Sequence, residues 1–434
     1  MRHRGLSAVA CVLAATLSAA CTRVARPADP TDLVAARYLE LASALVRQDE
    51  RSASGDDGVA SVSRTTPQVN LSLKDITTQA RAAVQELDGL PAASDTELRR
   101  PWLRAQLLAV ETRARQQAGE PVDLDEEFTR LYGIDLHSTM AGEPPGGDAQ
   151  SLDAVRTALD SLLPGTGTAA ERLDAFDATV TVPAPRLPAV FNAALEECRR
   201  RSREIVTLPE GEHVTVRYVV GEPWSGFSAY QGKDASVVSV NTSYPLTVDR
   251  VLQLACHEGY PGHHVINVLR DHARATRPEL EAVPLFSPEA FATEQVASKA
   301  TRLVFSDDER TAFERDTLFP LAGLPAAEAP RHVRVARLIE QLSPSIAEAL
   351  SQFLKQEQGF VETAWMLQRD ALMQHPRATI EFAAAFRGIA LAYSGYRPAP
   401  GSPGGLWLQR AGYPSEPVIM AGNGHHSSAS SYRK

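Results

Sequence analysis

The sequence has few cysteines, few aromatic side chains and fewer basic than acidic residues. Four cysteines in 434 residues are too few for a disulfide scaffold of this size. Aromatic residues make up 6%, and 44 basic against 53 acidic residues give a net charge of −9. Because proteins bind nucleic acids through cations and stacking rings, both shortages argue against a nucleic-acid partner. Hydrophobic residues still make up 44%, which is enough for a large core.

The N-terminus has no apolar run long enough to span a bilayer, which takes about 20 residues. Arg2 and Arg4 precede an apolar stretch over residues 6–17, and small residues follow it. This pattern predicts a secretory signal peptide over residues 1–20. Cys21 comes next, as in a bacterial lipobox, so we expect it to be the lipidated first residue of a cell-envelope lipoprotein, anchored on the extracytoplasmic face of a bacterial membrane. Plain secretion is the alternative.

The rest of the chain divides into three parts by composition. We expect a lipid-anchor tether with one helix over residues 21–66, one helical catalytic domain over 67–398, and a Gly/Pro/Ser-rich tail over 399–434. Export would allow Cys198 and Cys256 to form a disulfide. Free cysteines are also common as small buried residues, and we expect these two to be unpaired buried thiols.

The spacing of hydrophobic residues changes twice along the chain. It predicts helices over 32–47, 101–118, 123–132, 152–163, 169–179 and 188–203. Alternating valines then predict strands over 213–220 and 236–241, with 221–232 as the connection between them. Helical spacing returns at Thr247 and continues to about Tyr396. The sequence therefore predicts a mainly α-helical fold with a small β element.

One short segment concentrates the histidines. The chain has 11 histidines, and three of them lie in the eight residues His257-Glu258-Gly259-Tyr260-Pro261-Gly262-His263-His264. Thr247 or Asp249 can cap an amphipathic helix that leads into this segment. A metal hydrolase needs imidazoles that converge on one ion and a carboxylate that takes a proton from water. His257 and Glu258 supply a ligand and a base.

The spacing leaves the second imidazole ligand open. Zincins commonly place it four residues after the first, but that position is Pro261 here. Proline removes a backbone donor, so the helix should kink or bulge at this point, and Gly262 adds freedom. On an unbroken helix His264 shares the face of His257, whereas a distorted helix can bring His263 round instead.

The segment resembles the His-Glu-x-x-Pro-Gly-His signature of the bacterial family called domain of unknown function 885, which is similar to the gluzincin metallopeptidases. The family's Phe-x-x-Glu-Gly-Trp-Ala helix corresponds to residues 291–297, where Gln295 and Val296 replace Gly-Trp. Its Ala-Leu-x-Tyr motif corresponds to residues 390–393. The resemblance covers about residues 30–398 and implies a large helical, zincin-like metallopeptidase fold, with the small β element beside the active-site helix.

The resemblance also implies a Zn²⁺ site and an activity. Its ligands would be His257, His263 and Glu294, with His264 as the alternate histidine and Glu289 as the competing carboxylate. Glu258 would be the general base, and Tyr393 would donate a hydrogen bond to the oxyanion. The expected function is an exported zinc-dependent hydrolase that cleaves peptide or other amide bonds. The alternative is a non-catalytic envelope lipoprotein that keeps a metal or ligand site.

Substrate-binding residues are harder to predict from the sequence. Asn241 and Tyr230 belong to the valine-rich β region and could hold an extended peptide beside a strand. Arg397, or else Arg387, could bind a substrate carboxylate. We keep Asn241, Tyr230 and Arg397 as the predicted substrate-binding set.

Overall fold

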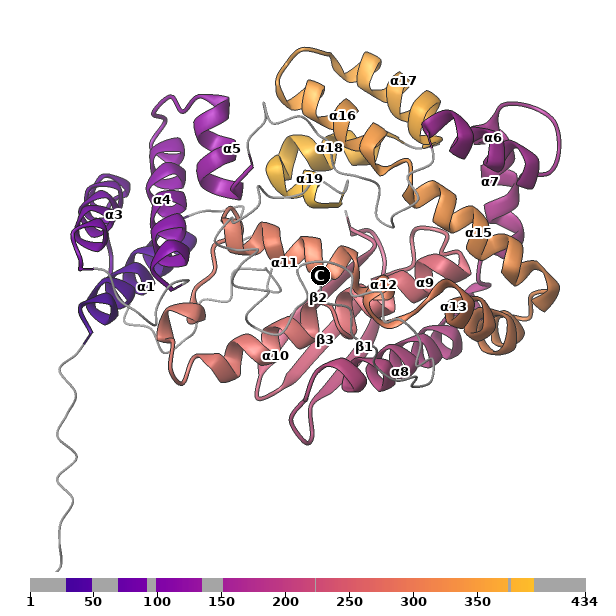
Figure 1. Ribbon diagram of the computed structural model, residues 1–434, viewed down its shortest axis with the longest axis horizontal. Coiled ribbons are helices and arrows are strands. Elements are labelled where there is room, and N and C mark those ends of the chain that lie inside the picture. Colours follow the sequence, from indigo (N-terminus) through magenta and orange to yellow (C-terminus); the bar gives the residue numbers. More distant parts are fainter. Residues whose placement is uncertain are drawn as a thin grey trace, which may run out of the picture.

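The computed structural model describes residues 29–48, 69–91, 99–134, 151–222, 224–373 and 376–393. The predicted signal peptide, Cys21, Arg397 and the predicted C-terminal tail lie outside these residues. Within them, no helix is both long and apolar enough to cross a membrane. The fold is mainly α-helical with one small sheet, which confirms the predicted fold class (Figure 1).

The N-terminal helices lie together on one side of the molecule (Figure 1). They are α1 (Pro30–Gln48), α3 (Leu73–Asp88), α4 (Arg99–Gln117) and α5 (Leu124–Tyr132). Helix α4 buries one apolar stripe completely, which consists of Leu103, Leu107, Val110 and Ala114. Helix α5 begins at Asp123, whose carboxylate accepts a hydrogen bond of 2.8 Å from the Glu126 amide. It ends at Gly133, which adopts the left-handed conformation (φ 68°).

The next three helices confirm the helical spacing of this region. They are α6 (Leu152–Leu162), α7 (Ala169–Val180) and α8 (Leu187–Ile205). Helices α6 and α7 lie next to the C-terminal part of the chain (Figure 1). Arg331 donates a hydrogen bond of 2.9 Å to the Leu162 carbonyl, and Arg156 pairs with Asp370 at 3.1 Å. These contacts join segments far apart in the sequence.

The sheet has three strands in the order β1-β3-β2. They are β1 (His213–Val219), β2 (Gly226–Gly232) and β3 (Ala235–Asn241). Strand β3 pairs in parallel with β1 and antiparallel with β2. Both predicted strands are confirmed, but the connection predicted over 221–232 is wrong, because its second half forms β2. Glycine, serine, alanine and glutamine give that segment little strand tendency, and its pairing with β3 decides its conformation.

Helices occupy most of the chain from Val248 to Tyr393, as predicted. The longer ones are α9 (Val248–Leu254), α10 (His263–Ala273), α11 (Pro288–Ser298), α13 (Asp307–Phe313), α15 (Ala329–Glu340), α16 (Ser343–Leu354), α17 (Phe360–Ala371) and α18 (Pro376–Phe386). The shorter ones are α12 (Ala300–Val304), α14 (Phe319–Ala322) and α19 (Gly388–Tyr393). In Figure 1, α16 to α19 form one group, and α11 lies between this group and the sheet.

Helix α11 lies where two hydrophobic clusters meet. The larger cluster draws residues from α1, α3, α4, α8 and α9, and the smaller one from α5, α11, α16 and α19. Phe291 belongs to the smaller cluster and the next residue, Ala292, to the larger. Because packing on both sides fixes α11, the side chain of Glu294 has a rigid support.

Candidate metal centre

The histidine segment forms a broken helix. Helix α9 continues as a π-helical turn over Ala255–Gly259, and we call α9 and this turn together the metal helix. The helix is interrupted at residues 260–262, and α10 begins at His263. A Cβ atom on Gly262 would lie 1.8 Å from the His257 carbonyl oxygen, so only glycine fits there. The kink or bulge predicted from Pro261 is confirmed, and the break redirects the chain between the two halves of the motif.

Two imidazoles and one carboxylate converge across this break. The Nε2 atoms of His257 and His263 lie 3.2 Å apart. An Oε1 atom of Glu294, from α11, lies 3.3 Å from His263 Nε2, and its Oε2 atom lies 3.7 Å from His257 Nε2. Glu258 lies slightly farther away, with Oε1 3.9 Å from His257 Nε2. We call these four residues the histidine–glutamate cluster.

The two carboxylates of the cluster are suited to different roles. Ligand atoms of His257, Glu258 and His263 all lie within 4.8 Å of one another, so Glu258 is also close enough to be a ligand. Glu294, however, reaches both imidazoles at shorter distances than Glu258 reaches His257. This geometry favours Glu294 as the ligand and leaves Glu258 beside the same point as a base.

Burial controls the protonation of the cluster. It lowers the pKa of His257 to about 3, with a further contribution from the charge of His263. It also raises the pKa of Glu258 to about 7. Burial acts to lower the pKa of His263 as well, but the Glu294 carboxylate raises it to about 9. The neutral His257 therefore keeps a lone pair available, and the point between His263 and Glu294 attracts positive charge.

His264 points away from the cluster. It is fully buried, with Nδ1 2.8 Å from the Ser236 hydroxyl and Nε2 3.1 Å from the Glu212 carboxylate. Glu212 also accepts a hydrogen bond of 2.6 Å from the Tyr260 hydroxyl. The structure thus brings His263, and not His264, to His257. Sequence reasoning missed Glu212, because a lone glutamate before a strand carries no distinguishing signal.

Arginines complete the surroundings of Glu212. Arg199 and Arg203, both on α8, each donate to its Oε1 atom at 2.9 Å. Burial acts to raise the pKa of Glu212, but the hydrogen bonds from His264, Tyr260 and Arg199 lower it to about 2. Glu212 is therefore a charged anchor that ties both ends of the break, Tyr260 and His264, to one point.

A disulfide holds the π-helical turn against α8. Cys198 and Cys256 are bonded, with their Cα atoms 5.5 Å apart, so the expectation of two unpaired thiols is wrong. Both residues are fully buried, so the expected burial is confirmed although the expected free thiols are not. No pattern in the sequence indicates that α8 packs against the metal helix. This tertiary packing brings the two cysteines together. His257 follows the bonded cysteine directly.

The predicted substrate-binding residues have other partners. Asn241 is fully buried and donates hydrogen bonds of 2.8 Å to the carbonyls of Glu222 and Trp224. The Tyr230 hydroxyl donates to Asp271 at 2.8 Å. The structure thus uses both side chains for local contacts and does not add them to the histidine–glutamate cluster.

The remaining predicted residues are placed in different ways. Glu289, the competing carboxylate, accepts a hydrogen bond of 2.9 Å from the Trp102 indole and lies 3.6 Å from Arg270. Arg387 pairs with Glu127. The backbone of Tyr393 ends α19, which packs against α11, but its side chain and Arg397 lie outside the described residues.

Strand β2 passes close to the proposed base. A Cβ atom on Gly226 would lie 2.8 Å from a Leu254 methyl group and 3.1 Å from Glu258 Oε1. Glycine therefore allows the strand to approach the metal helix. Because β2 lies at the end of the strand order, its outer edge is unpaired within the described sheet. An extended chain can add to such an edge.

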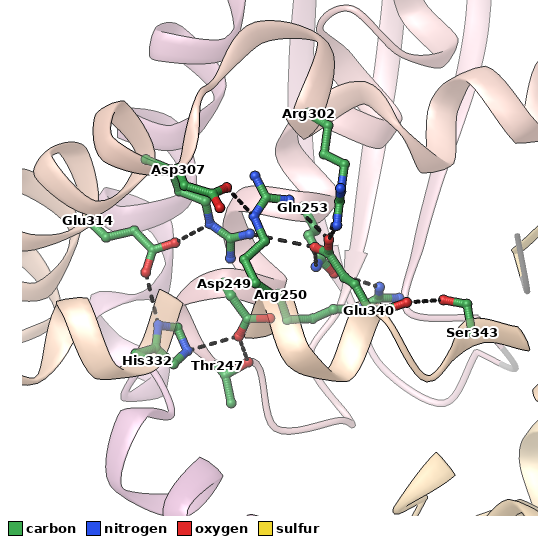
Figure 2. Close-up of polar contacts among 12 residues, drawn as sticks. Thr247, Asp249, Arg250, Gln253, Arg302, Asp307, Glu314, His332, Glu340 and Ser343 are labelled. Carbon is green, nitrogen blue, oxygen red and sulfur yellow. Dashed lines mark hydrogen bonds and ion pairs between the residues drawn. The ribbon is translucent and has the colours of Figure 1, made fainter. Parts of the chain in front are cut away.

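A second buried polar group lies at the other end of α9. His332 contacts Glu314 through Nδ1 at 2.9 Å and Asp249 through Nε2 at 3.0 Å (Figure 2). The fully buried Arg310 donates to Glu314 at 2.8 Å and lies 3.6 Å from Glu340. We call these five residues the ionic network. Thr247 precedes α9 and donates to Asp249, but its side chain does not cap the helix.

Comparisons with known proteins add little to this picture. No protein-family model matches the chain, and no curated protein sequence matches it. A solved structure from Colwellia psychrerythraea, described as a "putative lipoprotein", is similar with a TM-score of 0.43 and 14% identity, over 88% of this chain and 69% of that chain. The function is therefore argued from the site.

Proposed function

We propose that this protein is an exported metal-dependent hydrolase that cleaves peptide or related amide bonds. The observation that carries the proposal is the convergence of His257, His263 and Glu294, with Glu258 beside them. Two imidazoles and one carboxylate, here from three helical segments, form a common ligand set of catalytic zinc sites. The proposal agrees with the family resemblance of the sequence but does not depend on it.

The spacing of the three ligand atoms suits zinc. Tetrahedral zinc with bonds of about 2.0–2.1 Å keeps its ligand atoms roughly 3.3 Å apart. The contacts of 3.2, 3.3 and 3.7 Å are close to this separation. A hydrogen bond to the backbone of Ala297 also orients the His257 ring, as expected for a metal-binding histidine. The residues therefore fit Zn²⁺ with little rearrangement.

The reaction follows from the roles of these side chains. Zinc bound there would supply a Lewis acid that acidifies water and polarises the substrate carbonyl. Glu258 takes the proton from the attacking water and passes it to the leaving amine. Burial raises the pKa of Glu258 to about 7 in the metal-free site, and the charge of a bound zinc ion would lower it. Strand β2, which reaches Glu258 at Gly226, offers an edge on which an extended peptide can lie.

The location outside the cytoplasm is part of the same proposal. The N-terminal residues predict export and lipid attachment at Cys21, outside the described part of the chain. The disulfide between Cys198 and Cys256 supports export, since such bonds persist in oxidising compartments. We therefore propose an enzyme anchored to the extracytoplasmic face of a bacterial membrane.

The test combines metal analysis with a cleavage assay. Purified protein should bind one zinc ion and cleave members of a peptide library. Glu258→Gln should retain zinc but lose at least about 100-fold in rate. His263→Ala should lose zinc, whereas His272→Ala, a control for an exposed histidine on the same helix, should behave as wild type.

Three results would change the proposal. Full turnover by Glu258→Gln would remove that residue from the mechanism. A wild-type protein without affinity for zinc would overturn the metal centre. Zinc binding without cleavage of any peptide or muropeptide would support the alternative, a non-catalytic metal-binding lipoprotein.

A further inference from the structure

Arg250 lies on the metal helix, two turns before the proposed base. It is exposed on α9, eight residues before Glu258. At about 1.5 Å per residue, eight residues of an α-helix place the two Cα atoms about 12 Å apart along its axis, a little more than two turns.

Two polar groups fix the Arg250 guanidinium beside β2. One nitrogen donates to the Ser225 hydroxyl at 2.8 Å, and another lies 3.5 Å from Gln253 Oε1. Ser225 directly precedes Gly226, the residue that approaches Glu258. The guanidinium therefore lies at the start of the edge strand, one residue from the point where the strand meets the catalytic base.

Among the described residues, this guanidinium has no carboxylate partner. None of the described carboxylates lies within ion-pair distance of Arg250, whereas Arg199 and Arg310 each pair with acidic groups. Both of its contacts are with neutral side chains, which leave donors for a further acceptor. A guanidinium binds a carboxylate through two parallel hydrogen bonds, and an exposed one can do so without losing an existing ion pair.

The direction of β2 determines which end of a bound peptide would lie near Arg250. Strand β2 runs from Gly226, at Glu258, to Gly232, and its last residues lie near α10, because Tyr230 binds Asp271. Antiparallel pairing is the more stable arrangement. A peptide paired in this way runs toward Gly226, so the residues after its scissile bond approach Arg250.

We propose that Arg250 binds the C-terminal carboxylate of the substrate, which makes this protein a carboxypeptidase for short peptides. The inference rests on the proposed function. At about 3.3 Å per residue of extended chain, the roughly 12 Å between the Cα atoms of Glu258 and Arg250 accommodates a fragment of no more than about three residues. Water adds its oxygen to the scissile carbonyl carbon, the C–N bond breaks, and the amine of the released fragment takes the proton.

Two peptides that differ only at the C-terminus test the inference. N-terminally dansylated penta-alanine is offered to the zinc-loaded protein as the free acid and as the C-terminal amide. We expect kcat/KM for the acid to exceed that for the amide by roughly 10- to 100-fold, mostly through KM. Arg250→Gln should abolish this preference and Arg250→Lys should keep part of it. Arg377→Gln, an exposed arginine on α18, should leave it unchanged.

A binding measurement separates this inference from the proposed function. In Glu258→Gln, fluorescence anisotropy should show the acid bound roughly 10- to 100-fold more tightly than the amide, and adding Arg250→Gln should remove the difference. Equal binding of the two peptides, or no binding of either, overturns the role of Arg250. Preferential binding of the acid without turnover by the wild type would instead contradict the hydrolase while supporting the carboxylate site.

Discussion

The two buried polar groups at the ends of α9 differ in how well their charges are matched. In the ionic network, His332 contacts two carboxylates and Arg310 contacts two as well. In the histidine–glutamate cluster, burial drives the pKa of His257 down and that of Glu258 up. The first arrangement places each cationic side chain between two carboxylates, whereas the second favours an added cation. We propose that the matched charges orient the helix and that the unmatched ones provide the chemistry.

Breaking the ionic network should have the largest effect on stability. Arg310→Met leaves Glu314 buried with one partner fewer, so we expect the free energy of unfolding to fall by about 3–5 kcal/mol. Denaturant titration would measure the change. The control is Arg315→Met, whose exposed guanidinium pairs with the exposed Asp316, and it should leave the free energy of unfolding nearly unchanged. Similar losses in both variants would show that the buried ionic network stabilises the fold no more than an exposed ion pair does.

The ionic network should also give the protein an alkaline limit. Burial acts to lower the pKa of His332, but the carboxylates of Asp249 and Glu314 raise it to about 9, above its unfolded value near 6.5. A raised pKa stabilises the fold fully below pH 6.5, and this stabilisation is lost as the pH rises to about 9. We expect a loss of about 2–3 kcal/mol.

The variant His332→Gln tests this effect. Asp177 also titrates in this range, because burial raises its pKa to about 7, and the charge of His332 acts to lower it, so part of the difference between the two proteins comes through Asp177. The difference in unfolding free energy between wild type and His332→Gln should shrink between pH 6.5 and 9. A difference that stays constant across this range would show that His332 is neutral in the folded protein.

The smallest predicted effect concerns Glu212, which accepts hydrogen bonds from residues on both sides of the helix break. Glu212→Gln weakens the hydrogen bonds to Tyr260 and His264 without touching His257 or His263. We expect zinc affinity to fall about tenfold, as for other residues that orient a metal ligand, with the rate of the zinc-saturated enzyme nearly unchanged. Competition with a chelator would measure the affinity. An unchanged zinc affinity would mean that the break holds its shape without Glu212.

Part of the site could be predicted from residues that are close in sequence. His257 and Glu258 followed from residue type and spacing, and Pro261 indicated that the helix would break. The choice between His263 and His264 did not follow, because it depends on how far the break rotates the chain. Glu294 came only from the family resemblance, since a single glutamate on a buried helix has no distinguishing pattern.

The fold shows the same division. The helices of α4 to α8 and the two valine-rich strands were predicted from periodicity, because their burial pattern is a local property. Strand β2 was missed because its conformation comes from pairing with β3. The disulfide was missed because Cys198 and Cys256 are 58 residues apart and meet only through packing of α8 on the metal helix.

The sequence by itself determined which chemical groups are present and where the metal helix must break, because side-chain chemistry and proline geometry are local. Only the tertiary structure decided which of these groups meet. It brought Glu294 to the two imidazoles and turned His264 toward Glu212. It also left Arg250 beside β2 without an acidic partner in the part of the chain that the structure describes. Each of these depends on contacts between distant segments, whose burial and charge set the pKa values that a local pattern cannot supply.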